Sequence, residues 1–171
     1  PALAAAEAAL ALRLDQLLAP GDWCELAGSL PPGAGIGSWL RLARQVRTRG
    51  ARLVIDTGGT VLAELLQALK DPLDDGSSAL PALIKPNRAE LEELAGRALP
   101  TLAEVAEAAA ALQAGGVERV VVSLGGEGAV IVGDGGRWFA RPPKVDVATT
   151  VGAGDALVAG TLAALVEGRH F

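Results

Sequence analysis

The sequence predicts a three-layer, Rossmann-like α/β fold in which helices cover both faces of a mostly parallel sheet. Short apolar runs alternate with longer helical patterns, and this alternation is typical of parallel strands joined by crossover helices. The run Val117–Leu124 is rich in β-branched valine, which indicates a central strand. No internal repeat interrupts the pattern, so we expect residues 1–171 to form a single domain.

Helices are predicted where helix-forming residues or apolar residues at helical spacing lie between glycine and proline breakers. Ala2–Leu18 is rich in alanine and leucine and stops before Pro20. Thr101 and Glu104 form a capping-box pattern at the start of another helix. The expected helices span about 2–18, 36–50, 60–70, 87–96, 101–114 and 155–166.

Strands are predicted from short apolar runs that end at glycine or polar residues. Gly133-Asp134-Gly135-Gly136 is a hairpin signal between the last two of them. The expected strands span 23–27, 53–55, 82–84, 117–124, 129–132 and 137–140.

Composition excludes several classes of function. The chain has 171 residues, 50% of them hydrophobic, and a net charge of −5, which argues against a nucleic-acid partner or an anionic membrane surface. No apolar run reaches 18 residues, so no membrane span is predicted. The single cysteine, Cys24, is expected as a small buried strand residue, and it fits a reducing, cytoplasmic location. A chain without methionine is expected to be a piece of a longer protein.

Two common phosphate-binding fingerprints and one metal signature are missing. There is no G-x-x-x-x-G-K-[ST] loop, and neither Gly33–Gly37 nor Gly152–Gly154 has the third glycine of the G-x-G-x-x-G pattern. Clusters of cysteine and histidine with metal-ligand spacing are also missing.

Unusual residues follow four of the predicted strands. In a parallel sheet, ligands bind outside the carboxyl ends of the strands, so these loops are expected to line one crevice. The four segments are Gly28-Ser29, Asp56-Thr57, Lys85–Asn87 and Ser123–Gly125.

The sharpest signal is Gly152-Ala153-Gly154-Asp155, just before a helix of small residues. Glycines at a helix start leave backbone N–H groups accessible, and the helix dipole adds positive potential, so an anion or a transferring phosphoryl group would be stabilised there. Asp155 could accept a proton from an attacking hydroxyl. The alternative interpretation is that Asp155 only caps the helix.

Asn87 and Glu90 allow two interpretations. They match a capping box, and they could also orient water around Mg²⁺. Lys85 could contact a phosphate, or it could be an ordinary surface lysine. Ser123–Gly128 suits a nucleotide phosphate but could equally be a glycine-rich turn. Asp56 could accept a sugar hydroxyl or form a local turn.

Taken together, these blocks resemble the ribokinase-like (PfkB) carbohydrate kinases, and they occur in the same order along nearly the whole chain. The Thr-Val-Gly-Ala-Gly-Asp block is highly specific for that family. The matching blocks are Leu26–Pro31, Asp56–Gly59, Lys85–Glu90, Val122–Ala129 and Thr150–Asp155.

The resemblance implies the roles of individual residues. Asp155 corresponds to the catalytic base that contacts the sugar substrate, and Gly152, Ala153 and Gly154 correspond to the anion hole. Asn87 and Glu90 correspond to a motif that acts on Mg²⁺, here expected to work through water. The residues implied to bind ATP are Lys85, Asn87, Ser123, Leu124, Gly125, Gly126, Glu127, Gly128 and Gly154.

The resemblance also implies a reaction: transfer of the ATP γ-phosphoryl group to fructose 1-phosphate, giving fructose 1,6-bisphosphate, with Mg²⁺ as cofactor. Tagatose 6-phosphate or another sugar is the alternative acceptor. The family's N-terminal third, its lid and its last helices have no counterpart here, so the chain resembles the C-terminal nucleotide-binding portion of the fold. A fragment that binds nucleotide without turnover is a further alternative. The full-length protein is expected to form a homodimer.

Overall fold

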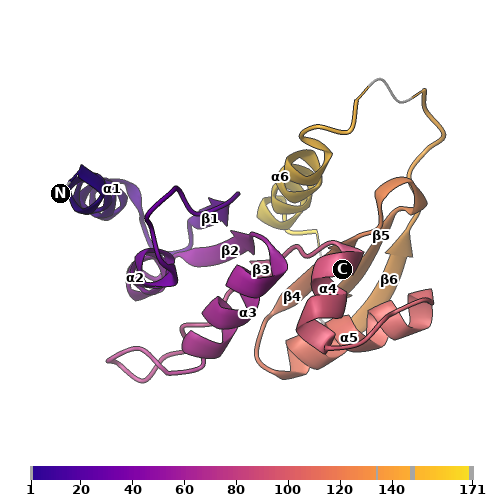
Figure 1. The fold of residues 1–171 in the computed structure, drawn as a ribbon, viewed down its shortest axis with the longest axis horizontal. Coiled ribbons are helices and arrows are strands. Elements are labelled where there is room, and N and C mark those ends of the chain that lie inside the picture. Colours follow the sequence, from indigo (N-terminus) through magenta and orange to yellow (C-terminus); the bar gives the residue numbers. More distant parts are fainter. Residues whose placement is uncertain (1, 134, 147–148, 170–171) are drawn as a thin grey trace. The chain divides into compact units, whose positions relative to one another are not determined.

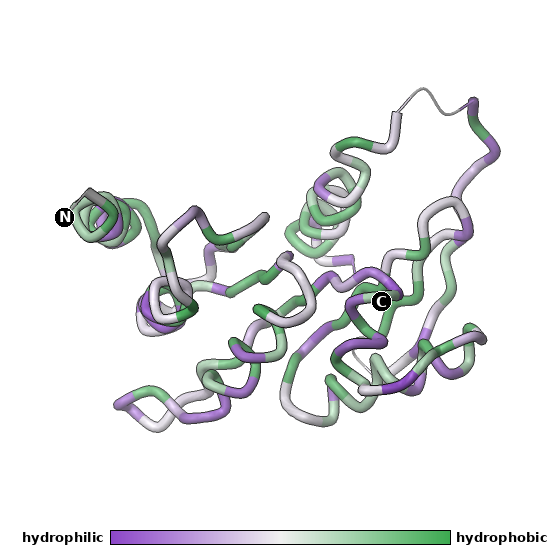
Figure 2. Tube along the Cα trace, viewed as in Figure 1, coloured by the Kyte–Doolittle hydropathy of each residue, from purple (hydrophilic) through white to green (hydrophobic). Residues whose placement is uncertain are grey.

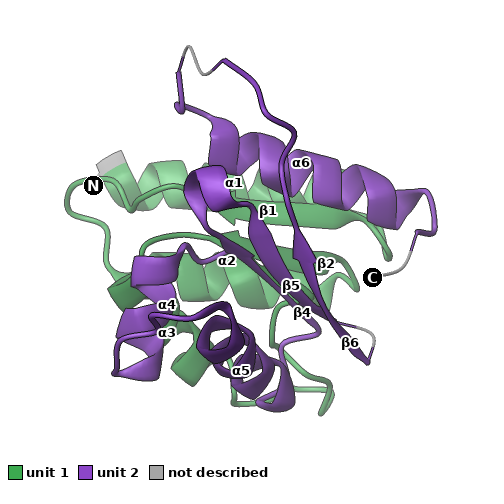
Figure 3. Ribbon diagram, turned by 90° about the vertical axis from the view of Figure 1, so that its right-hand side faces the viewer, with its two compact units in different colours: residues 1–84 green, residues 85–171 purple. Residues whose placement is uncertain are grey.

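The computed structural model describes residues 2–133, 135–146 and 149–169. These residues form two compact units, Pro1–Ile84 and Lys85–Phe171, coloured separately in Figure 3. Each unit carries its own strands, helices and buried apolar residues, and each is described separately below. The prediction of a single domain stays a prediction.

The first unit is a parallel βα arrangement (Figure 1). Strand β2 pairs in parallel with β1 on one side and with β3 on the other. The helices alternate with the strands along the chain, as the sequence predicts. The elements are α1 (Ala2–Leu17), β1 (Trp23–Ala27), α2 (Ile36–Thr48), β2 (Arg52–Asp56), α3 (Gly59–Ala68) and β3 (Leu83–Ile84).

The core of this unit is built on β2. Leu53, Val54 and Ile55 are completely buried, and so are Leu62 and Leu65 of α3. Burying a leucine or isoleucine side chain contributes about 1.5–3 kcal/mol, so this cluster holds the strand order. Cys24 is only half-buried, because β1 is the edge strand of the unit, and this burial raises the pKa of the thiol. Cys24 therefore lies in a strand, as expected, but the expectation that it is buried was wrong.

The second unit contains an antiparallel meander, β4–β5–β6. Val120 of β4 pairs with Val132 of β5, and Val130 of β5 pairs with Phe139 of β6. Connections as short as these can only join antiparallel strands, so the protein's sheet structure is mixed rather than uniformly parallel. The elements are α4 (Arg88–Ala95), α5 (Leu102–Ala114), β4 (Arg119–Ser123), the 3₁₀ turn η1 (Gly125–Glu127), β5 (Ala129–Gly133), β6 (Gly136–Ala140) and α6 (Ala153–Val166).

Burial in the second unit centres on the valines of β4. Val120, Val121 and Val122 are buried, as are Val105 and Ala109 of α5. Strands β4 and β5 and helix α6 are mainly hydrophobic in Figure 2, in line with their sequences. No helix in the described part of the chain is long and apolar enough to cross a membrane.

Candidate functional site

Two of the predicted loops meet in the second unit. Asn87, just after β3, forms a parallel bridge with Ser123 at the end of β4. The Ser123 N–H donates to the Pro86 carbonyl at 3.0 Å. The segment that begins at Lys85 therefore runs beside the start of the glycine-rich loop, as expected for the carboxyl ends of neighbouring strands.

Asn87 and Glu90 make a complete capping box at the start of α4. The Asn87 side-chain oxygen accepts from the Glu90 N–H at 3.0 Å, and Glu90 Oε2 accepts from the Asn87 N–H at 2.8 Å. The capping interpretation is thus correct. The capping box uses only Oε2 of Glu90. The other carboxylate oxygen, Oε1, is not part of the box and belongs to a partly exposed side chain.

Few side chains that could bind a metal ion lie together in the described part of this protein, which limits how Mg²⁺ could be held. Among the described residues there is no group of three or more histidine, cysteine, aspartate or glutamate side chains that could hold a metal ion. Mg²⁺ keeps several waters and uses few protein oxygens when it is bound with phosphates, so one partly exposed carboxylate fits it through water. Glu90 would supply that carboxylate, and Asn87 would orient it.

The glycine-rich loop is a tight turn closed by its own backbone. The Leu124 N–H donates to the Gly128 carbonyl at 2.9 Å, and the Gly128 N–H donates to the Gly125 carbonyl at 3.2 Å. Gly125, Gly126 and Glu127 are exposed, whereas Leu124 is buried and anchors the turn. The exposed part is therefore accessible to a ligand.

Gly128 occupies a position that only glycine fits. Its φ is +122°, and a Cβ there would collide with the carbonyl oxygen of Ala140 on β6. The close approach of two backbones sets where the loop ends and β5 begins.

The N-cap residue of helix α6 is Gly152, which has a left-handed φ of 76° and no side chain to cap the helix. Asp155 lies in the first turn and is exposed. Among the residues that the structure describes, its carboxylate has no hydrogen bond or ion pair, so a capping role is not seen. The Ala153 N–H donates to the Thr150 carbonyl at 3.2 Å, a bond that an anion at this turn would have to replace.

Lys85 reaches the first turn of α6. Its side chain is buried, with 7% of the residue exposed. A Cβ placed on Gly154 would lie 3.2 Å from Lys85 Nζ, so the ammonium group sits against the glycine backbone. Two sources of positive potential, the ammonium and the helix N-terminus, thus lie at one place.

The loops after β1 and β2 lie in the first unit. The Gly28 N–H donates to the Asp56 carbonyl at 2.9 Å, and the Thr57 hydroxyl donates to the Gly28 carbonyl at 2.7 Å. These two loops are held together locally, as are the two in the second unit. A single crevice lined by all four stays a prediction.

Sequence reasoning missed one residue of the second unit, Arg88. Its Nη2 lies 3.4 Å from the Glu127 carboxylate in the glycine-rich loop. A cation in the first turn of a helix is electrostatically unfavourable, so its presence there was a signal of a tertiary partner.

The whole chain, residues 1–171, matches the model of the pfkB family carbohydrate kinases. The chain belongs to this family. It is 44% identical to a 1-phosphofructokinase of Rhodobacter capsulatus over 98% of this chain and 51% of the relative. It is 40% identical to the 1-phosphofructokinase of Escherichia coli K12, over 85% of this chain and 43% of the relative.

Solved structures confirm the fold of this pfkB family member. Phosphofructokinase-2 from Escherichia coli, in complex with substrates and products, matches with a TM-score of 0.82 and 31% identity over 95% of this chain and 50% of that one. Ribokinase from Arabidopsis thaliana, with ribose and ATP, matches with a TM-score of 0.67 and 26% identity over 86% of this chain and 44% of that one. The chain spans about half the length of the curated relatives it matches.

Replacing Gly128 by alanine should destabilise this pfkB chain, since the positive φ alone costs on the order of 1–3 kcal/mol and the Ala140 carbonyl leaves no room. Gly126→Ala is the matched control, because a Cβ there meets nothing within 4 Å. Chemical denaturation should show a clear loss for Gly128→Ala and a change within about 0.5 kcal/mol for Gly126→Ala. Equal midpoints for the two variants would contradict the packing described for this loop.

Proposed function

We propose that the full-length protein is an ATP-dependent kinase that transfers the γ-phosphoryl group of ATP to a hydroxyl of fructose 1-phosphate, giving fructose 1,6-bisphosphate. The observation that carries the proposal is the convergence of Lys85 and the start of α6 at Gly154. A buried ammonium beside helix N–H groups suits phosphate oxygens, whose charge must be stabilised during phosphoryl transfer. The names of the relatives, 1-phosphofructokinases, favour fructose 1-phosphate as acceptor.

Each residue has a defined part in the proposed reaction. The Asp155 carboxylate accepts the proton of the sugar hydroxyl, and the hydroxyl oxygen forms a bond to the γ-phosphorus. The bond from that phosphorus to the β-phosphate oxygen breaks, and ADP leaves with the electron pair. The N–H groups of Gly152, Ala153 and Gly154 stabilise the charge on the transferring group.

The remaining residues hold the nucleotide and its metal. Lys85 neutralises phosphate charge, and the loop from Ser123 to Gly128 provides N–H groups to phosphate oxygens. Mg²⁺ would neutralise part of the triphosphate charge, and the Glu90 carboxylate, oriented by Asn87, would hold it through water. The single cysteine agrees with a reducing compartment, so we place the protein in the cytoplasm. From the family resemblance we also expect the full-length protein to act as a homodimer.

A second candidate is favoured by the length comparison. Because this chain spans about half of its relatives, its residues alone could bind ATP·Mg²⁺ without turning it over. Calorimetric titration of the isolated chain, followed by an assay for released ADP, separates binding from turnover.

Asp155→Asn in the full-length protein should lower kcat by about 10²–10⁴-fold, because the amide cannot accept the hydroxyl proton. The affinity for ATP should change little, since the carboxylate is not a phosphate ligand. Asp146→Asn, an exposed residue ahead of α6, is the control and should keep its kcat. A kcat near wild type for Asp155→Asn would remove the base from the proposal.

Gly154→Ala should weaken ATP binding by roughly three- to ten-fold, since the new methyl group would lie 3.2 Å from Lys85 Nζ and push the ammonium away from the glycine backbone. Gly160→Ala is matched to it, because it lies in the same helix and its new methyl group would meet nothing within 4 Å. That control should bind ATP normally and be no less stable, as alanine favours a helix over glycine. Equal affinities in both variants would argue against a phosphate site at Gly154.

The acceptor is tested by kcat/KM on fructose 1-phosphate, fructose 6-phosphate, tagatose 6-phosphate and free fructose. We expect fructose 1-phosphate to give the highest value. A higher kcat/KM for tagatose 6-phosphate or another sugar would support the proposed kinase activity but contradict fructose 1-phosphate as its acceptor.

A further inference from the structure

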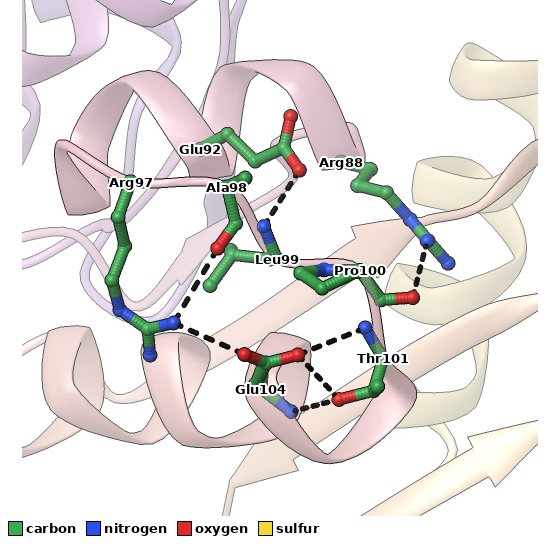
Figure 4. A network of polar contacts seen from close by, with 8 residues as sticks. All are labelled: Arg88, Glu92, Arg97, Ala98, Leu99, Pro100, Thr101 and Glu104. Atoms are coloured by element: carbon green, nitrogen blue, oxygen red, sulfur yellow. Dashed lines mark hydrogen bonds and ion pairs between the residues drawn. The ribbon is translucent and has the colours of Figure 1, made fainter.

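Arg88 joins three segments of the second unit. It is the first residue of α4, yet its guanidinium contacts groups outside that helix. Nη2 lies 3.4 Å from Glu127 Oε2 in the glycine-rich loop, and Nη1 lies 3.5 Å from the carbonyl oxygen of Pro100. Figure 4 shows Arg88 pointing toward the Pro100 carbonyl. The guanidinium therefore bridges the loop and the α4–α5 connection.

Helix stability does not explain an arginine at this position. The N-terminus of a helix carries positive potential, which repels a cation in the first turn. The acidic residue of that turn, Glu90, is used in the capping box with Asn87. The favourable interactions of Arg88 at this position are thus its contacts with Glu127 and with the Pro100 carbonyl.

The Pro100 end of the bridge is firmly held (Figure 4). The Leu99 N–H donates to Glu92 at 2.8 Å, and Leu99 is completely buried. Glu104 accepts from the hydroxyl of Thr101 at 2.6 Å, and this bond keeps the pKa of Glu104 below its usual value. The connection is a rigid support for Arg88.

The other end is held less firmly. The turn at Gly125–Glu127 has hydrogen bonds of its own backbone, and its three residues are exposed. Because two of them are glycines, ordering the turn costs more conformational entropy than it would with other residues, so an external contact helps to hold it. The Arg88–Glu127 ion pair is such a contact, from a partly buried guanidinium with 29% of its side chain exposed.

We propose that Arg88 is a positioning residue for the glycine-rich loop: its guanidinium links Glu127 to the Pro100 carbonyl and so presets the N–H groups of Gly125–Gly128 for the ATP phosphates. The part concerning ATP rests on the proposed function, whereas the link itself does not. Preorganised N–H groups bind phosphate better because less conformational entropy is lost on binding.

The first experiment is independent of any activity. Amide hydrogen exchange of residues 125–128 is measured in the ligand-free full-length protein, for wild type, Arg88→Met and Arg97→Met. Arg97 is the matched control, because it pairs with Glu104 and donates to the Ala98 carbonyl in the same network without touching the loop. We expect about two- to five-fold faster exchange in Arg88→Met only, the range for one partly exposed ion pair. Unchanged exchange in Arg88→Met, or equal acceleration in both variants, would overturn the proposal.

The second experiment is a double-mutant cycle on KM for ATP with Arg88→Met and Glu127→Gln. If Arg88 acts through Glu127, each single variant raises KM by about two- to five-fold with kcat nearly unchanged, and the double variant is no worse. Effects that multiply, or an unchanged KM in Glu127→Gln, would overturn positioning and indicate direct contact between Arg88 and nucleotide. A wild-type protein without kinase activity would refute the proposed function instead, and hydrogen exchange would then decide the role of Arg88.

Discussion

The close approach of the Lys85 ammonium to the backbone of Gly154 is the constraint on which the candidate site depends. A buried ammonium is costly unless polar groups surround it, and a helix N-terminus by itself adds further positive potential. Placing the two together concentrates positive potential in a small volume. Such a concentration of positive potential suits the oxygens of a phosphate group, which is the ligand proposed for this place.

Two glycines of this site are approached closely by other groups, and each for a different reason. At Gly154 the absence of a side chain admits the ammonium group, and at Gly128 it admits the carbonyl of Ala140 on the neighbouring strand. The first approach shapes the place where charge would be stabilised. The second fixes the end of the loop that would hold the nucleotide. Gly154 would therefore affect charge stabilisation, and Gly128 the shape of the loop.

Structural and proposed functional roles coincide at the start of α4. Asn87 and Glu90 satisfy the backbone groups of the helix end, which any helix requires. The same cap fixes the direction in which Arg88 leaves the helix, and it leaves the second carboxylate oxygen of Glu90 able to accept from water. A capping box is therefore no argument against function, because a well-capped helix end is also a rigid platform.

Much of the fold was predictable because it is local. The alternation of apolar runs with helical patterns placed β1 at its observed bounds and α5 within one residue, and the hairpin signal located the turn between β5 and β6. The Thr101–Glu104 cap was also foreseen, since a capping box involves residues three apart. Such features depend on periodicity and on short-range hydrogen bonds, which the order of residues contains directly.

The tertiary structure alone decided which distant residues meet. Sequence reasoning named Lys85 and Gly154 separately, but their contact depends on how a strand end and a helix start pack. It gave Arg88 no role, because the link from Arg88 to Glu127 spans 39 positions and leaves no periodic trace. The sequence by itself determined the elements and the blocks that mark the family. Long-range packing determined the electrostatics of the site, because charges act through distance in space and not through separation along the chain.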